Sequence, residues 1–321
     1  MLGTFVVLYL FLGGAGAGAL FVAAVWSLLF HRTVTRTFEQ SRAFRALAGR
    51  LYLVGFGLLA LSAFCLLIDL GSPHRFFLLF LRPTASLLSV GSFVLLATLL
   101  ASGLLAAFHA LGWSAPSWAR KGLEVICAVL AAVLMVYTGL YLAWMEAVPL
   151  WNNAALPALF ALSSFSSGVA IVLLLVPYAR DWALLSGWID GLHRAHLAAL
   201  GLEFLALVAF VALAATNPFA GSSLVRLVSP AGQGPWFIAG FVLGGIVVPF
   251  GAEAARPFTG RTAPVAAAEV LCLFGGLILR FCLVLAGSHW LGGYNASRRK
   301  TSVLVGRANR KAANGLWPCS R

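Results

Sequence analysis

Long apolar runs dominate the chain, and the short stretches between them carry most of the charged residues. The runs show no regular alternation of apolar and polar positions, which argues for helices rather than for the strands of a membrane barrel. Most of the runs reach the roughly 20 residues that a helix needs to cross a bilayer. The pattern predicts an all-α integral membrane protein with eight transmembrane helices, arranged as two four-helix bundles. The predicted segments are 4–30, 50–70, 86–110, 122–147, 155–178, 195–216, 235–252 and 264–289.

The composition leads to the same conclusion. Of the 321 residues, 61% are hydrophobic and 10% are charged, whereas a soluble domain has about 45–50% apolar and about 25% charged residues. A soluble fold of this size could not bury so much apolar surface. We therefore expect residues 1–297 to form one eight-helix membrane domain, and residues 298–321 to form a basic, disordered tail.

The charges predict an orientation. The formal net charge is +13, and in a membrane protein such an excess indicates topology and contact with anionic lipid rather than nucleic-acid binding. The connections after the first, third, fifth and seventh segments hold eleven Lys and Arg residues, against three in the opposite connections. The positive-inside rule places the eleven in the cytoplasm and Met1 outside. The three are Arg75, Arg82 and Arg226, and the eleven are Arg32, Arg36, Arg42, Arg45, Arg50, Arg120, Lys121, Arg180, Arg194, Arg256 and Arg261.

The basic tail conflicts with this orientation, because eight helices return the C-terminus to the outer side. Seven Lys and Arg residues follow residue 297. Either the helix number is wrong by one, or the early helices fix the topology and the tail is carried along. We favour the second explanation, and the side of the tail stays open.

Small residues mark two of the segments. Residues 13–19 consist of Gly and Ala, and Gly14 and Gly18 stand four apart, which lets two helix backbones approach closely in lipid. Packing is the simpler interpretation; the alternative is that the small residues leave room for a flat ligand. The seventh segment is short, and we expect it to kink, because it contains Gly240, Gly244, Gly245 and Pro249.

Acidic side chains follow one another from the predicted inner face toward the middle of the bilayer. Glu124 and Glu253 stand at the inner ends of their segments, Glu269 is about one turn deeper and Glu203 about two turns. Each charge inside a bilayer costs about 2.5–3.5 kcal/mol on insertion scales and so needs a reason. A series of carboxylates suits a proton relay. The plainer interpretation, which we favour for Glu124 and Glu253, is that these two are interfacial.

Arg280 continues the series at greater depth, near the level of Tyr137 and Thr138, and Asp69 and Glu146 end their segments at the outer face. For Glu203 and Arg280, a functional role and a buried pairing are equally good interpretations. The candidates for proton transfer are Glu203, Glu269, Arg280, Glu124 and Glu146.

Metal-binding motifs are absent from the sequence. The five cysteines contain no CxxC pair, so we expect no iron–sulfur cluster and no metal site in this chain. A haem with two histidine ligands needs them on facing helices at equal depth. Only His109 and His196 are open to this, and both are expected at the interface, while His31, His74 and His193 are placed in loops. We therefore expect no haem.

Two predicted outer connections have distinctive residues. A tight turn follows the second segment at residues 69–76, where Asp69 and Arg75 can pair across Gly71 and Pro73. After the fourth segment, residues 149–153 bring a Trp and two Asn side chains to the outer interface. Such residues suit either a docking surface or an ordinary aromatic belt. The candidate docking residues are His74, Trp151, Asn152 and Asn153.

The order of these motifs resembles the NrfD/polysulfide-reductase membrane-subunit family. The resemblance runs from the first segment to the eighth and leaves out only the basic tail. Each motif alone is weak, but the ordered set is specific. The set comprises Tyr9-Leu10-Phe11-Leu12-Gly13-Gly14, Asp69-Leu70-Gly71-x-Pro73-x-Arg75-Phe76, Tyr137-Thr138-Gly139, Pro149-Leu150-Trp151-Asn152-Asn153, Ser163-Ser164-x-Ser166-Ser167-Gly168 and Gly275-Gly276-x-x-x-Arg280.

The resemblance implies an eight-helix, haem-free subunit that handles a quinone, either menaquinone or ubiquinone, in the bacterial or archaeal cytoplasmic membrane. It implies an iron–sulfur partner subunit of the ferredoxin type, docked on the outer loops, and a molybdopterin catalytic subunit beyond it. Tyr137 matches the tyrosine expected to donate a hydrogen bond to a quinone carbonyl. The implied quinone site is completed by Thr138, Tyr9, Asp69 and Arg75. Some members place a histidine on the first helix near the quinone, and here Tyr9 is the only polar aromatic residue in that segment.

Two alternatives stay open from the sequence. Discontinuous helices with intramembrane Glu and Arg would also suit a secondary transporter. A structural anchor without quinone chemistry would keep the fold alone. The terminal substrate, the quinone type, the direction of electron flow and proton pumping are not encoded in this chain.

Overall fold

Helices account for nearly all of the computed structural model of the chain, which describes residues 4–33, 37–69, 87–110, 113, 116–179, 181–259 and 265–287. No strand occurs in these ranges. Eight helices are long and apolar enough to cross a membrane, as predicted. The long helices are α1 (Thr4–Arg32), α2 (Phe38–Asp69), α4 (Leu87–Ala110), α5 (Ser117–Ala143), α6 (Leu156–Leu175), α7 (Ser186–Thr216), the continuous pair η4 (Trp236–Val247) and α9 (Val248–Thr259), and the helix Val265–Gly287.

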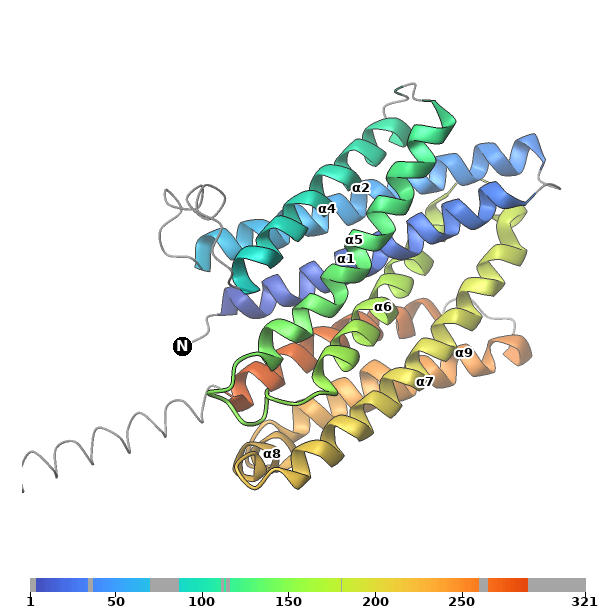
Figure 1. Cartoon of the computed structure of the whole chain (residues 1–321). Helices are drawn as coiled ribbons and strands as arrows, with labels where there is room; N and C mark the ends of the chain where they lie inside the picture. Colours follow the sequence, from blue (N-terminus) through green and yellow to red (C-terminus); the bar gives the residue numbers. More distant parts are fainter. Residues whose placement is uncertain are drawn as a thin grey trace, which may run out of the picture.

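Two groups of helices lie side by side (Figure 1). In the first group α1 packs on α2 and α5, and α4 closes the group by packing on both of those helices. In the second group α6 packs on α7, and α7 on α9. The Val265–Gly287 helix contacts α6 through Arg280 and α7 through Glu269. Helix α6 joins the groups because it also packs on α1 and α5.

Short helical pieces complete the connections. The turns η2 (Val176–Tyr178) and η3 (Trp182–Leu185) link α6 to α7, and α8 (Gly221–Val228) follows α7. The start of α1, the segment 144–155 and α8 lie at one end of the molecule, at the lower left in Figure 1. The end of α1 and the start of α7 lie at the opposite end. Large apolar side chains such as Leu100 and Leu205 are exposed on the outside, where lipid would surround them.

Two helices begin earlier than the sequence predicted. Helix α2 starts at Phe38 rather than at residue 50, because Phe44, Leu47 and Leu51 recur at helical spacing and bury one face between arginines. Helix α7 starts at Ser186 rather than at residue 195. The prediction that His193 lies in a loop was therefore wrong: His193 is on α7, and the charges around it had been mistaken for the end of the helix.

The small-residue face of α1 serves helix packing. A Cβ atom on Gly18 would overlap the backbone of α6 at Ser164, and one on Gly168 would overlap the backbone of Gly18. A Cβ on Gly14 would lie 2.9 Å from a guanidinium nitrogen of Arg280. The packing interpretation is therefore confirmed at these positions, and protein atoms fill the space that a flat ligand would need.

The seventh transmembrane helix is irregular, as its glycines predicted. Residues Trp236–Val247 form a π-helix, and the α-helical continuation α9 begins at Val248. Gly245 packs on the backbone of Gly275, where an added Cβ would lie 2.7 Å from the Cα atom of Gly275. Wide turns of this kind redirect side chains within a helix. Here the irregular part leads directly into α9, which carries Glu253.

Candidate functional site

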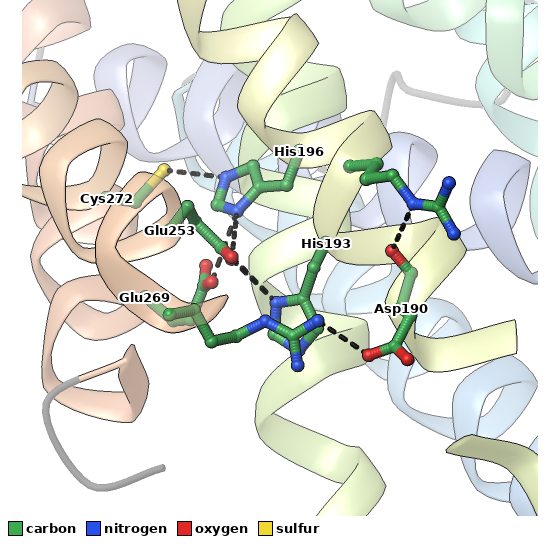
Figure 2. A network of polar contacts seen from close by, with 8 residues as sticks. Asp190, His193, His196, Glu253, Glu269 and Cys272 are labelled. Carbon is green, nitrogen blue, oxygen red and sulfur yellow. Dashed lines mark hydrogen bonds and ion pairs between the residues drawn. The ribbon is translucent and has the colours of Figure 1, made fainter. Parts of the chain in front are cut away.

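Two histidines and two glutamates from three helices meet at one point in the second group of helices (Figure 2). His193 and His196 stand three residues apart on α7 and therefore share a face. The Nδ1 atom of His193 lies 2.8 Å from Oε1 of Glu253 on α9. The Nδ1 atom of His196 lies 3.4 Å from the same oxygen and 3.1 Å from Oε1 of Glu269, which comes from the Val265–Gly287 helix. We call these four residues the His–Glu cluster.

The His–Glu cluster is almost completely buried. The exposed fractions of the side chains are 13% for His193, 0% for His196, 1% for Glu253 and 2% for Glu269. Neighbouring helices cover Glu253 and His196, so neither side chain contacts solvent, and their predicted depth at the interface stays a prediction. Two buried carboxylates need compensation, which a proton on a carboxyl group, protonated imidazoles or a bound cation can supply.

An ion pair borders the cluster on the side of His193. Arg256 of α9 lies 2.6 Å from Asp190 of α7, and both are partly exposed. These two residues stand three positions from Glu253 and His193, so the ion pair joins the same two helices one turn away. It holds α7 against α9 independently of the cluster.

Polar contacts lead from the cluster toward Glu203. The Nε2 atom of His196 lies 3.8 Å from Sγ of Cys272, and Cys272 lies 4.0 Å from Oγ of Ser166. Ser166 in turn donates a 2.7 Å hydrogen bond to Oε2 of Glu203. The structure thus brings Glu253, Glu269 and Glu203 into one series, as the sequence suggested, but Glu124, predicted in the same series, lies in the other group of helices. The linking residues Cys272 and Ser166 were not predicted for this role, although the serine run of α6 is visible in the sequence.

Arg280 lies farther along the Val265–Gly287 helix, where it faces α6, and its side chain is fully buried. Its guanidinium donates hydrogen bonds to Ser164 Oγ at 2.8 Å and to the carbonyl of Gly276 at 2.8 Å. The guanidinium carbon Cζ of Arg280 is 5.1 Å from the centre of the Phe160 ring, within cation–π range. Among the described residues no carboxylate lies within ion-pair distance of Arg280, so neutral acceptors and aromatic rings hold this charge.

Glu124 belongs to a separate place in the first group of helices. Ser27 of α1 donates a 2.8 Å hydrogen bond to Oε1 of Glu124, and Nε2 of His109 lies 3.6 Å from the same oxygen. The ring of Tyr52 stacks on His109. Glu124 is fully buried among helices, and its predicted depth at the interface stays a prediction. His109 and His196 lie in different groups of helices, and each faces its own carboxylates rather than the other histidine.

Three tyrosines lie near the end of α2. Tyr137 and Tyr141 of α5 have ring centres 6.1 Å apart, Tyr9 of α1 interacts electrostatically with Tyr137, and Asp69 does so with Tyr141. We call these four residues the tyrosine cluster. Tyr9 and Tyr137 are buried, Tyr141 is partly buried and Asp69 is exposed, so the cluster runs from the interior to the surface.

Tyr137 has an unusual environment within this cluster. Its side chain is packed so closely on α4 that a Cβ on Gly91 would overlap the ring. Its hydroxyl is buried and makes no hydrogen bond of standard geometry, and its polar neighbour is the side chain of Tyr9. Thr138 differs, because its hydroxyl bonds the carbonyl of Met135 in its own helix. Of the other predicted quinone and docking residues, Arg75 and His74 lie outside the described residues.

The comparisons with known proteins agree with this architecture. Residues 1–292 match the sequence model of the family described as "Polysulphide reductase, NrfD". The chain belongs to the NrfD family. It is therefore a multi-pass integral membrane protein of that family, which also accounts for its eight apolar helices.

Two curated members of the NrfD family are similar to parts of the chain. "Protein NrfD" of Escherichia coli K12 is 32% identical over 172 residues, which are 52% of this chain and 53% of that protein. "Protein NrfD homolog" of Haemophilus influenzae is 42% identical over 74 residues, or 23% of this chain and 21% of that protein. The chain thus matches about half the length of the first relative and less of the second.

Residues 149–153 connect helices through two buried side chains. Trp151 is fully buried and donates a 2.8 Å hydrogen bond from Nε1 to the carbonyl of Leu283. Asn153 is buried and donates a 3.0 Å bond to the carbonyl of Phe210 on α7. Of the predicted docking residues in this segment, Asn152 is exposed, and so is the nearby Glu146.

Proposed function

We propose that this NrfD-family chain is the membrane anchor and quinone-exchanging subunit of a respiratory redox complex. Family membership supports the role of a membrane subunit, and the tyrosine cluster supports the quinone. A phenol can donate one hydrogen bond while its ring lines an apolar pocket, and it carries no permanent charge. These properties suit a quinone carbonyl. The single observation that carries the proposal is the buried hydroxyl of Tyr137, which makes no hydrogen bond of standard geometry and faces the side chain of Tyr9.

The position of the tyrosine cluster suits electron exchange with a partner. It lies at the end of α2, and its exposed member Asp69 marks the molecular surface there. In the proposed reaction a quinol loses two protons and two electrons, and the electrons would pass one at a time through an iron–sulfur cluster of a ferredoxin-type partner subunit; in the reverse direction a quinone would take up two electrons and two protons. Tyr137 orients the carbonyl or hydroxyl oxygen of the head group. Asp69 accepts or supplies a proton at the surface.

The buried series in the second group of helices supports coupled proton transfer. Glu203 accepts a hydrogen bond from Ser166 and interacts electrostatically with Arg280. A carboxyl group next to a hydroxyl and a buried cation can hold a proton and release it without moving far. We propose Glu203 as the proton carrier of this region, with Arg280 stabilising its charged form.

A conservative variant tests the quinone proposal. The complex is purified with and without Tyr137→Phe, and quinol-dependent electron transfer is measured. Loss of one hydrogen bond worth about 1–2 kcal/mol predicts a roughly tenfold lower turnover with normal assembly. Tyr52→Phe is the matched control, because Tyr52 is buried, its hydroxyl also makes no hydrogen bond of standard geometry, and it lies outside the tyrosine cluster. Unchanged turnover in Tyr137→Phe, or an equal loss in both variants, would refute the proposed role.

A further inference from the structure

We propose that the His–Glu cluster binds one divalent transition-metal ion, for which Zn²⁺ is the best match. The inference goes beyond the proposed quinone exchange and does not depend on it. His193, Glu253 and Glu269 offer ligand atoms that all lie within 4.8 Å of one another. His196 adds a second imidazole next to the two carboxylates; it stands outside this set of atoms and must shift to complete the site. Two imidazole nitrogens and two carboxylate oxygens form a donor set that zinc takes in proteins.

Three of the distances between ligand atoms are close to those of a tetrahedral site. Bonds of about 2.0–2.1 Å to a tetrahedral ion place neighbouring ligand atoms about 3.3 Å apart. The Nδ1 atom of His196 lies 3.1 Å from Glu269 and 3.4 Å from Glu253, so two edges already have this length. The His193–Glu253 distance of 2.8 Å must widen slightly. His193 has room for this movement, because its side chain is the most exposed of the four.

An unpartnered carboxylate oxygen points to a missing ligand. Oε2 of Glu269 is buried and has no hydrogen-bond partner, and leaving such a group unpaired costs about 1–3 kcal/mol or more for a charged one. Two buried carboxylates with two neutral imidazoles also carry two uncompensated negative charges. A divalent cation between the four residues would supply the partner and balance the charge together.

Cys272 lies next to His196, one of the proposed metal ligands. A histidine that binds a metal through one ring nitrogen usually donates its other N–H to a nearby acceptor, which fixes the ring orientation. The Nδ1 atom of His196 faces the carboxylates, and its Nε2 atom lies 3.8 Å from Sγ of Cys272. His193 is partly exposed and provides the route by which an ion reaches the site. The proposal assigns Glu269 to the metal and leaves Glu203 outside the site.

A cobalt titration tests the proposal. The full chain is purified, stripped of metal with a chelator, placed in phosphatidylcholine nanodiscs and titrated with Co²⁺, whose visible absorption reports tetrahedral coordination. We expect one Co²⁺ per chain, displaced by Zn²⁺, and a higher unfolding temperature in its presence. His196→Ala should abolish the absorption, and Cys272→Ala should weaken binding about tenfold through the loss of the ring-orienting contact. The control His109→Ala removes a buried histidine that also faces a glutamate, and it should leave binding unchanged.

The outcomes separate this proposal from its alternatives. A wild-type chain without stoichiometric, tetrahedral Co²⁺ would overturn it and leave protons as the charges that balance the cluster. Co²⁺ binding that survives His196→Ala would assign the ion to other histidines and would also overturn it. Glu269→Gln is the second variant if His196→Ala does not fold, because it keeps the size of the side chain and removes its charge. Quinol turnover is measured separately on the complex, so failure of the metal site leaves the quinone test intact.

Discussion

At the scale of single residues, burying a polar side chain in the membrane interior is unfavourable in free energy. The structure stabilises such side chains in three different ways. Arg280 uses serines, a backbone carbonyl and aromatic rings. Glu203 uses a serine hydroxyl, and Arg280 acts on it electrostatically from beyond ion-pair distance. In the His–Glu cluster, imidazoles face carboxylates from other helices. A residue such as Glu203, which has no ion-pair partner in contact with it among the described residues, keeps the freedom to exchange a proton.

The variant Glu203→Gln tests whether the carboxyl group of Glu203 carries a proton. The amide oxygen of Gln can still accept the hydrogen bond from Ser166, so we expect normal folding, but an amide cannot carry a proton. Proton uptake coupled to quinol turnover should fall about tenfold or more. The measurement is proton uptake by proteoliposomes that contain the purified complex. Glu39→Gln is the control, because Glu39 is an exposed glutamate in the first turn of α2. Equal proton uptake in Glu203→Gln and wild type would exclude Glu203 as the carrier.

At the scale of helices, backbone contacts between glycines set the positions of the polar residues. Gly18 meets Gly168 where α1 crosses α6, and Gly245 meets Gly275 where η4 crosses the last transmembrane helix. Because lipid offers little hydrophobic drive for helix association, close backbone packing supplies much of the attraction. The second contact fixes the two helices that carry Glu253 and Glu269.

Gly18→Ala should therefore be much more harmful than its size suggests. The added Cβ would overlap the α6 backbone, and such overpacking costs about 1–3 kcal/mol or more. Gly57→Ala is the matched control on α2, where an added Cβ meets nothing within 4 Å and should stabilise the helix by roughly 0.5–1 kcal/mol. Thermal unfolding in detergent compares the two variants. The packing argument fails if Gly18→Ala unfolds at the wild-type temperature.

Helices were more predictable from the sequence than the contacts between them. Apolar runs give the eight spans directly, and the glycines of the seventh run predict its irregularity. The early starts of α2 and α7 were not predicted, because arginines near Phe44 and His193 interrupt the apolar run although one face of each helix is buried there. The His–Glu cluster could not be predicted, because its members come from segments whose relative rotation depends on packing. The spacing of His193 and His196 was the one available signal.

At the scale of the whole molecule, charge is distributed unevenly between the two ends. The end that holds the close of α1 and the starts of α2, α5 and α7 carries Arg32, Arg42, Lys121 and other basic residues. The end that holds the tyrosine cluster has the exposed acids Asp69 and Glu146. A basic cytoplasmic end would contact anionic lipid, and it would leave the end with the tyrosine cluster to face the proposed partner outside.

Labelling of single cysteines tests this orientation. Asn152→Cys places a thiol at the end with the tyrosine cluster, and Glu39→Cys places one at the basic end; both positions are exposed. With a membrane-impermeant thiol reagent, we expect Asn152→Cys to react in intact spheroplasts and Glu39→Cys to react only after lysis. The four described native cysteines are buried, which keeps the background low, and the unmodified chain measures what remains. The reverse pattern would place the end with the tyrosine cluster on the cytoplasmic side. The proposed iron–sulfur partner would then have to dock from the cytoplasm, so this measurement also decides in which compartment to search for it.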